Sequence, residues 1–156
     1  MKRLLQIMVV FMTFTAFNVY AAWVQSGPLN MVTVFEEWPD DPDTTSSTIN
    51  VLVPRAEINV VTGTTGLIIV LFCGDVGFGP PGAATDVGAM TIELFIDGNL
   101  MKPGTTMFAQ NVDAQNQCAT FMDKVKAGPH VIQVYWRSLG GEQMFMGFRT
   151  LTILHR

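Results

Sequence analysis

Charged residues are scarce in this sequence, and basic residues are the scarcer kind. Only 14% of its 156 residues are charged, and 9 Lys and Arg stand against 13 Asp and Glu, a net charge of −4. The chain therefore lacks the basic surface that nucleic-acid binding needs. It is also unlike a disordered chain, because 49% of its residues are apolar. Its length is that of a single domain.

Residues that commonly carry catalysis are also few. The chain has 2 His, with His130 at the start of an apolar run and His155 next to the end, and they do not have the spacing of a metal-binding pair. No serine lies in a G-x-S-x-G nucleophile elbow. We therefore predict a protein that is not an enzyme and needs no cofactor. We interpret His130 as a structural strand residue rather than a catalytic base.

Long hydrophobic stretches are confined to the amino-terminal end. Two basic residues precede an almost unbroken apolar run over 4–17, and Val19 and Ala21 follow. A basic start, an apolar run of this length and small residues at a cleavage point are typical of a secretory signal peptide. We predict that 1–21 is removed and that 22–156 forms one domain with a net charge of −6. The alternative is a membrane anchor, but the run over 4–17 is shorter than the about 20 apolar residues that span a bilayer.

Cysteine is limited to 2 residues, Cys73 and Cys118. An even number of cysteines in an exported chain favours a disulfide, and this wide separation is not the CxxC spacing of zinc and redox sites. A Cys73–Cys118 bond would close a loop of about 44 residues, which the chain-entropy estimate values at roughly 3–4 kcal/mol. Two buried free thiols are the alternative.

After the leader, short apolar runs alternate with turn residues, and no stretch of ten or more residues combines a helical period with a cap. Leu67–Phe72 is apolar throughout, which favours a strand buried on both faces. Loops are predicted over 36–47, which is acidic, and over 74–88, which is rich in Gly and Pro. The predicted strands are 32–35, 49–53, 58–61, 67–72, 90–96, 100–101, 119–125, 130–137, 143–145 and 149–154.

Two local patterns sharpen this prediction. Asp97-Gly98 between apolar runs is typical of a β-hairpin, because both residues accept a positive φ. Within His130–Arg137, Ile132, Val134 and Trp136 share one face, which we expect to be buried. Eight to ten short strands at this spacing predict an all-β fold, a jelly-roll-like antiparallel β-sandwich.

Gly77–Gly82 matches the G-x-G-x-x-G pattern of dinucleotide-binding loops. That motif works by offering backbone N–H groups and a helix start to a pyrophosphate. Here Pro80 and Pro81 lack the N–H, and no helical pattern follows. We therefore predict a structural loop.

The acidic segment Glu36–Asp43 is a candidate for calcium binding, because Asp40, Asp41 and Asp43 carry the oxygen ligands that Ca²⁺ prefers. The spacing lacks the D-x-D-x-D-G order of a calcium loop. A solvated acidic loop is therefore the favoured interpretation, and calcium binding stays open.

Aromatic residues suggest an alternative role. Their large contact area and polar handles suit a sugar-stacking face or a protein interface. The candidate residues are Trp23, Trp38, Phe78, Tyr135 and Phe145.

The carboxyl-terminal half, about residues 66–154, resembles C1q/TNF-like jelly-roll domains of exported or phage-associated bacterial proteins. The resemblance implies a binding or assembly module that is often homotrimeric and has no catalytic residues. It rests on the hairpin Phe95–Gly98, the segment Ala127–Arg137 with its Gly128-x-His130 start, the pair Gly140-Gly141 and the closing strand Arg149–Ile153.

The sequence thus predicts a secreted, periplasmic or cell-surface module with a structural, adhesive or assembly role. We expect a homo-oligomer, for which a trimer is one candidate, because a mature chain of this size leaves apolar surface to cover. The alternative is a secreted carbohydrate-binding module that uses exposed aromatics. The expected partners are further copies of the chain and a glycan or protein ligand. Neither nucleic acid nor stable membrane insertion after processing is expected.

Overall fold

The computed structural model describes residues 30–36, 42–79, 88–110 and 115–156. The predicted signal peptide, Trp23 and Trp38 lie outside the described residues. All regular elements in the described part are strands, so it contains no helix that could span a membrane. The strands are β1 (Asn30–Glu36), β2 (Asp43–Thr45), β3 (Val51–Thr62), β4 (Gly66–Phe78), β5 (Ala89–Ile96), β6 (Asn99–Leu100), β7 (Thr106–Gln110), β8 (Gln115–Val125), β9 (Gly128–Ser138) and β10 (Met144–His155).

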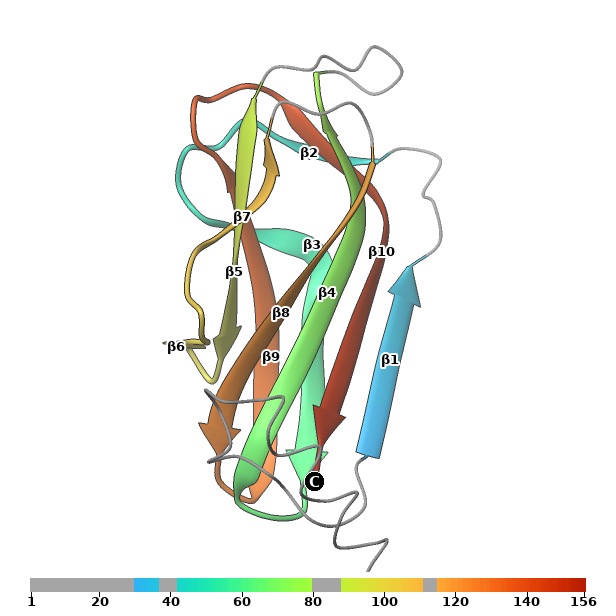
Figure 1. Ribbon diagram of the computed structural model, residues 1–156, viewed down its shortest axis with the longest axis vertical. Helices are drawn as coiled ribbons and strands as arrows, with labels where there is room; N and C mark the ends of the chain where they lie inside the picture. The colour runs from blue at the N-terminus through green and yellow to red at the C-terminus, as the bar shows by residue number, and fades with distance from the viewer. Residues whose placement is uncertain (1–29, 37–41, 80–87, 111–114) are drawn as a thin grey trace, which may run out of the picture.

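The strands form two antiparallel sheets packed face to face (Figure 1). Sheet A has the order β1-β10-β4-β8, and β2 pairs with β10 on the same side as β1. Sheet B has the order β3-β9-β5-β6, and β7 also pairs with β5. The chain passes back and forth between the sheets, as it does when two Greek keys form a jelly roll. The predicted jelly-roll-like β-sandwich is confirmed.

The core lies between the sheets and is built by period-two alternation. On β9, Ile132, Val134 and Trp136 are all buried, which confirms the predicted face. On β4, Ile68, Val70 and Phe72 are buried in the same way from the opposite sheet. The side chains between these positions point outward, and they form the two outer faces of the sandwich.

The prediction that Leu67–Phe72 is buried on both faces is wrong. Leu67 and Ile69 are half-buried and Leu71 is 37% exposed, because none of the described elements covers the outer side of sheet A. The loop predicted over 74–88 is also wrong for its first part, since β4 continues to Phe78. Gly74 pairs with Gln117 of β8 on one side and Arg149 of β10 on the other, and this double pairing overrides the poor strand propensity of glycine.

Irregular pairing explains three further differences. Pro54 does not divide β3, which is an edge strand and absorbs the proline in a register shift between Leu52 and Glu57. Arg55 has a φ of 58° at this irregularity. The runs 143–145 and 149–154 belong to one strand, β10, whose register shifts between Met146 and Arg149.

Two segments that the sequence presents as non-strand are paired. Glu36 ends β1 and Asp43–Thr45 forms β2, so the loop predicted over 36–47 is wrong at both places. β7, Thr106–Gln110, was not predicted, because its alternation is short and follows a Gly-rich turn. In both cases the segment forms a strand because it pairs with another strand, β10 for β2 and β5 for β7. The local sequence pattern does not predict this pairing.

Candidate functional surfaces

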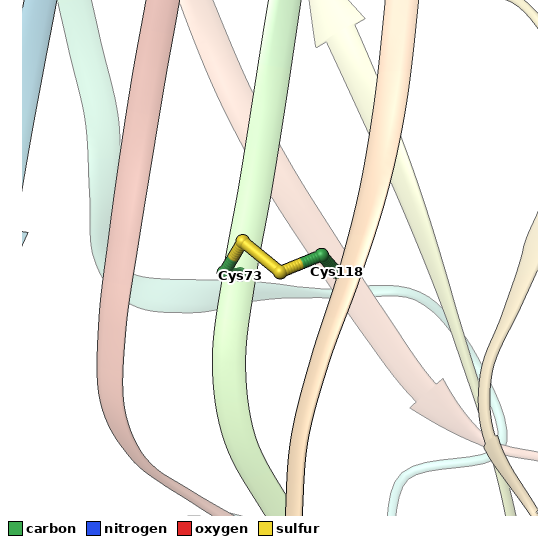
Figure 2. The surroundings of a disulfide bond; sticks show 2 residues. All are labelled: Cys73 and Cys118. Carbon is green, nitrogen blue, oxygen red and sulfur yellow. A yellow bond between two sulfur atoms is a disulfide. The ribbon is translucent and has the colours of Figure 1, made fainter.

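A disulfide joins Cys73 of β4 to Cys118 of β8 across the outer side of sheet A (Figure 2). The two residues are register partners, and their Cα atoms lie 4.1 Å apart. Cys73 lies between the buried residues Phe72 and Gly74, and Cys118 is exposed, so the bond lies on the outer face and not in the core. It ties the edge strand β8 to the centre of the sheet.

Three cross-strand rows form the middle of the outer face of sheet A, between the flanking pairs Leu67-Lys124 and Asp75-Asn116. The first row is entirely apolar and crosses all four strands, and the next two are rich in threonine. We call these three rows the sheet-A face; none of their residues is charged. The rows are Met31-Leu154-Ile69-Met122, Thr33-Thr152-Leu71-Thr120 and Thr150-Cys73-Cys118.

Several apolar side chains of the sheet-A face are open to solvent. Met31 is 68% exposed, Met122 is 44% exposed and Leu71 is 37% exposed. The Thr33 and Thr152 hydroxyls lie 3.3 Å apart and satisfy one another within the sheet. Continuous apolar surface of this kind marks interaction sites on soluble proteins.

The outer face of sheet B is different, because polar and aromatic residues share it. Tyr135 and Phe95 meet edge to face, with ring centroids 5.2 Å apart and planes at 73°. Glu93, the register partner of Tyr135, is only 7% exposed although it points outward. Its carboxylate accepts a hydrogen bond from Asn50 Nδ2 at 2.5 Å and another from the Thr105 hydroxyl.

Two more side chains on this face are each held by one internal hydrogen bond. Gln133 Nε2 donates to Glu57 Oε2 at 2.7 Å. Arg137 Nε donates to the Thr91 hydroxyl at 3.2 Å. We call this group the sheet-B face, and it consists of Asn50, Glu57, Thr91, Glu93, Phe95, Thr105, Gln133, Tyr135 and Arg137.

His130 and Asp97 form a polar contact between the β5–β6 turn and the start of β9. His130 Nδ1 lies 2.6 Å from Asp97 Oδ2, and His130 Nε2 lies 2.8 Å from the Lys126 carbonyl oxygen. Asp97 also accepts a bond from the Val131 N–H at 2.9 Å. The bond to Asp97 raises the pKa of His130, and the bond to His130 lowers the pKa of Asp97. This pair joins two of the four segments on which the sequence resemblance rests, Phe95–Gly98 and Ala127–Arg137.

Asp43, a candidate calcium ligand, is engaged by two arginines. Its Oδ2 accepts a bond from Arg149 Nη2 at 2.6 Å and lies 3.2 Å from Arg55 Nη2. Arg149 is buried and also donates to the Pro54 carbonyl at 2.8 Å. The carboxylate therefore fastens β2 to the irregular parts of β3 and β10. The Glu36 side chain and residues 37–41 lie outside the described part of the chain.

The three candidate aromatics that the structure describes do not form one surface. Phe78 is buried in the core and Phe145 is only 4% exposed, so the interpretation of these two as surface-stacking residues is wrong. Phe145 alternates with the core residues Met144 and Met146, so it is buried outside the core. Tyr135 is half-buried on the sheet-B face, beside Phe95, which the sequence did not single out.

The other sequence candidates have structural surroundings. Gly77 and Phe78 of the G-x-G-x-x-G match belong to β4, and Pro80–Gly82 lie outside the described residues. His130 is buried at the start of β9, and His155 is buried at the end of β10. Among the residues that the structure describes, no group of three or more His, Cys, Asp or Glu is arranged to hold a metal.

Solved structures of other proteins are similar to this chain. The VP2 subviral particle of infectious bursal disease virus matches with a TM-score of 0.51 and 12% identity, over 85% of this chain and 34% of the VP2 chain. A family 35 carbohydrate-binding module from an environmental isolate matches with a TM-score of 0.44 and 13% identity, over 85% of this chain and 77% of that chain. Disulfide-linked pili of Bacillus endospore appendages match with a TM-score of 0.40 and 15% identity, over 89% of this chain and 97% of that chain.

At these identities, the VP2 match shows a shared jelly-roll-like fold and nothing about activity. This chain corresponds to about a third of the VP2 chain. No family model matches the chain, and no curated protein matches it.

Proposed function

We propose that this chain is a non-catalytic assembly module that self-associates through the sheet-A face. The observation that carries the proposal is the set of three uncharged rows, in which Met31, Leu71 and Met122 are exposed. Covering these side chains removes apolar surface from water without burying an unpaired charge. The sheet-B face is less suited to self-association, because Glu57 and Arg137 would both have to be desolvated.

The three rows form the central part of an assembly contact. Four strands about 4.8 Å apart, with three outward side chains about 6.6 Å apart along each strand, give a face of roughly 19 Å by 20 Å, or about 400 Å². A stable protein interface buries about 800 Å² on each partner. The remaining area of such an interface would come from the flanking parts of sheet A and from its edges.

Two further features support the proposal. The resemblance to C1q/TNF-like domains favours a trimer as the assembled state. The Cys73–Cys118 disulfide supports an oxidising location, secreted, periplasmic or at the cell surface, because disulfides persist there. In that setting the module would act as a structural or adhesive unit.

Sedimentation of the mature chain tests the proposal. We expect a concentration-dependent oligomer at micromolar concentration. The variant Leu71→Glu places a carboxylate at the centre of the sheet-A face and should weaken association at least about a hundredfold, because burying an unpaired charge costs several kcal/mol.

Leu139→Glu is the matched control, because Leu139 is also exposed but lies in the turn after β9. This control should associate like the parent chain. A parent chain that stays monomeric, or a Leu71→Glu chain that assembles as well as the parent, would contradict the proposal.

A further inference from the structure

We propose that the sheet-B face is a binding site for a neutral saccharide. This inference does not depend on self-association, since it concerns the opposite side of the sandwich. The observation behind it is a repeated arrangement: three polar side chains are each fixed through one atom and keep another atom unbonded. They are Asn50, Gln133 and Arg137.

The fixed atoms are the donors that the internal network uses. Asn50 is held through Nδ2, Gln133 through Nε2 and Arg137 through Nε. Within the described residues, Asn50 Oδ1, Gln133 Oε1 and the two terminal guanidinium nitrogens of Arg137 make no hydrogen bond. All three side chains are only half-buried, so these atoms are within reach of a ligand.

Glu93 is the positioning residue of this network. Glu93 is only 7% exposed, and Asn50 and Thr105 both donate a hydrogen bond to its carboxylate. Asn50 precedes β3 and Glu93 belongs to β5, so the Asn50 side chain reaches across β9 between Tyr135 and Arg137. Because these side chains are already ordered in the free protein, a ligand that binds them has a smaller entropic cost to offset.

An aromatic surface lies within this polar group. Tyr135 is the register partner of Glu93, and Phe95, the register partner of Gln133, contacts its ring edge to face. The Tyr135 hydroxyl makes no hydrogen bond to another described residue, and the ring is half-buried. An apolar platform beside fixed polar groups is the usual lining of a small-molecule site.

The chemistry of the unbonded atoms selects the ligand class. Two amide oxygens accept hydrogen bonds, the guanidinium donates them, and the tyrosine hydroxyl does both. A ring of hydroxyl groups satisfies all of these and has apolar C–H faces to pack on Tyr135. The charges of Glu57, Glu93 and Arg137 leave a net −1, which disfavours an anionic ligand. A neutral saccharide fits best.

Titration followed by NMR tests the site. The probes are neutral oligosaccharides of glucose, xylose, mannose, galactose and N-acetylglucosamine. At least one should shift the side-chain amide signals of Asn50 and Gln133 in a saturable way. Gln133→Ala and Tyr135→Ala should each raise the Kd at least about tenfold, the effect of losing about 1.4 kcal/mol. Tyr135→Phe, which keeps the ring, should lose less.

Two controls separate this proposal from the one on assembly. Thr120→Ala changes an exposed residue of the sheet-A face and should leave saccharide binding unchanged. The Leu71→Glu chain should bind the saccharide like the parent, whatever its oligomeric state. The proposal is overturned if none of the probes gives saturable shifts, or if binding persists unaltered in both Gln133→Ala and Tyr135→Ala while their spectra show a folded chain.

Discussion

The two outer faces of this sandwich are stabilised in different ways. On sheet A, a disulfide and a pair of threonine hydroxyls hold the strands together and leave apolar side chains exposed. On sheet B, hydrogen bonds centred on the buried Glu93 hold the strands together and leave polar atoms exposed. The disulfide links its strands without a charged or amide side chain, whereas the network on sheet B depends on such side chains.

This difference indicates a division of roles. Exposed apolar rows without charge favour contact with a like surface, which can cover them completely. Fixed polar atoms beside an aromatic pair favour a smaller polar ligand, because each unbonded atom then gains a partner. The inner faces of both sheets are alike and serve only the core.

Removing the disulfide should have the largest effect on folding. In Cys73→Ser with Cys118→Ser, the free energy of unfolding should fall by about 4 kcal/mol, because the closed loop spans 45 residues of sequence. Urea unfolding of the variant and of the reduced parent chain should agree with one another. A loss below about 1 kcal/mol would show that sheet A does not depend on its covalent link.

Removing the Glu93 carboxylate is the corresponding test on sheet B. Glu93→Ala should lower the free energy of unfolding by about 2 kcal/mol, because two hydrogen bonds to a buried charged group are lost. Glu57→Ala, which removes an exposed carboxylate with one bond, should change it by less than about 0.5 kcal/mol. Equal losses of unfolding free energy in the two variants would contradict the positioning role of Glu93.

The His130–Asp97 pair should make stability depend on pH. The pKa of His130 is raised above 6.5, so its contribution is complete below that pH and is lost as the pH rises through the raised value. The pKa of Asp97 is lowered below 3.8, so its contribution is lost as the pH falls through the lowered value. The pair thus stabilises most between these limits.

Asp97→Asn isolates this contribution, since asparagine accepts the φ of 50° found at this turn residue. We expect a loss of a few tenths to about 1 kcal/mol near pH 5.5 and a smaller loss at pH 8.5, measured by urea unfolding. A loss that does not depend on pH in this range would show that His130 titrates with its ordinary pKa.

The smallest expected effect concerns the composition of the sheet-A face. Thr120→Val replaces an exposed hydroxyl with a methyl group beside Leu71, the register partner of Thr120. Association should strengthen about two- to fivefold, since one added apolar group of this size contributes up to about 0.8 kcal/mol. Sedimentation measures this change. Weaker association would indicate that the threonine hydroxyls themselves form the contact.

Much of the fold could be predicted from the sequence. The alternation in His130–Arg137, the Asp97-Gly98 turn and the absence of helical periodicity are local signals, and each agrees with the structure. The errors arose where distant strands pair. β4 extends through Gly74–Phe78 because it has a neighbour on both sides, and β3 continues past Pro54 because an edge strand tolerates an irregularity.

The two faces could not have been predicted in the same way. The row Met31-Leu154-Ile69-Met122 draws one residue from each of four distant strands, so it exists only once the register is known. Glu93 alternates with apolar residues and reads as an exposed position. Its burial comes from Asn50 and Thr105, which no local pattern links to it. Tyr135 is the single candidate aromatic that the structure places on a described outer face.

Methionine oxidation by dilute peroxide, followed by mass spectrometry across a range of protein concentrations, tests the division between the faces most directly. Met31 and Met122 lie on the sheet-A face, whereas Met107, which is 48% exposed, pairs with Thr91 on the outer side of sheet B. As concentration rises, Met31 and Met122 should become protected while Met107 stays reactive. Protection of Met107 alone, or no change at any of the three, would contradict the account.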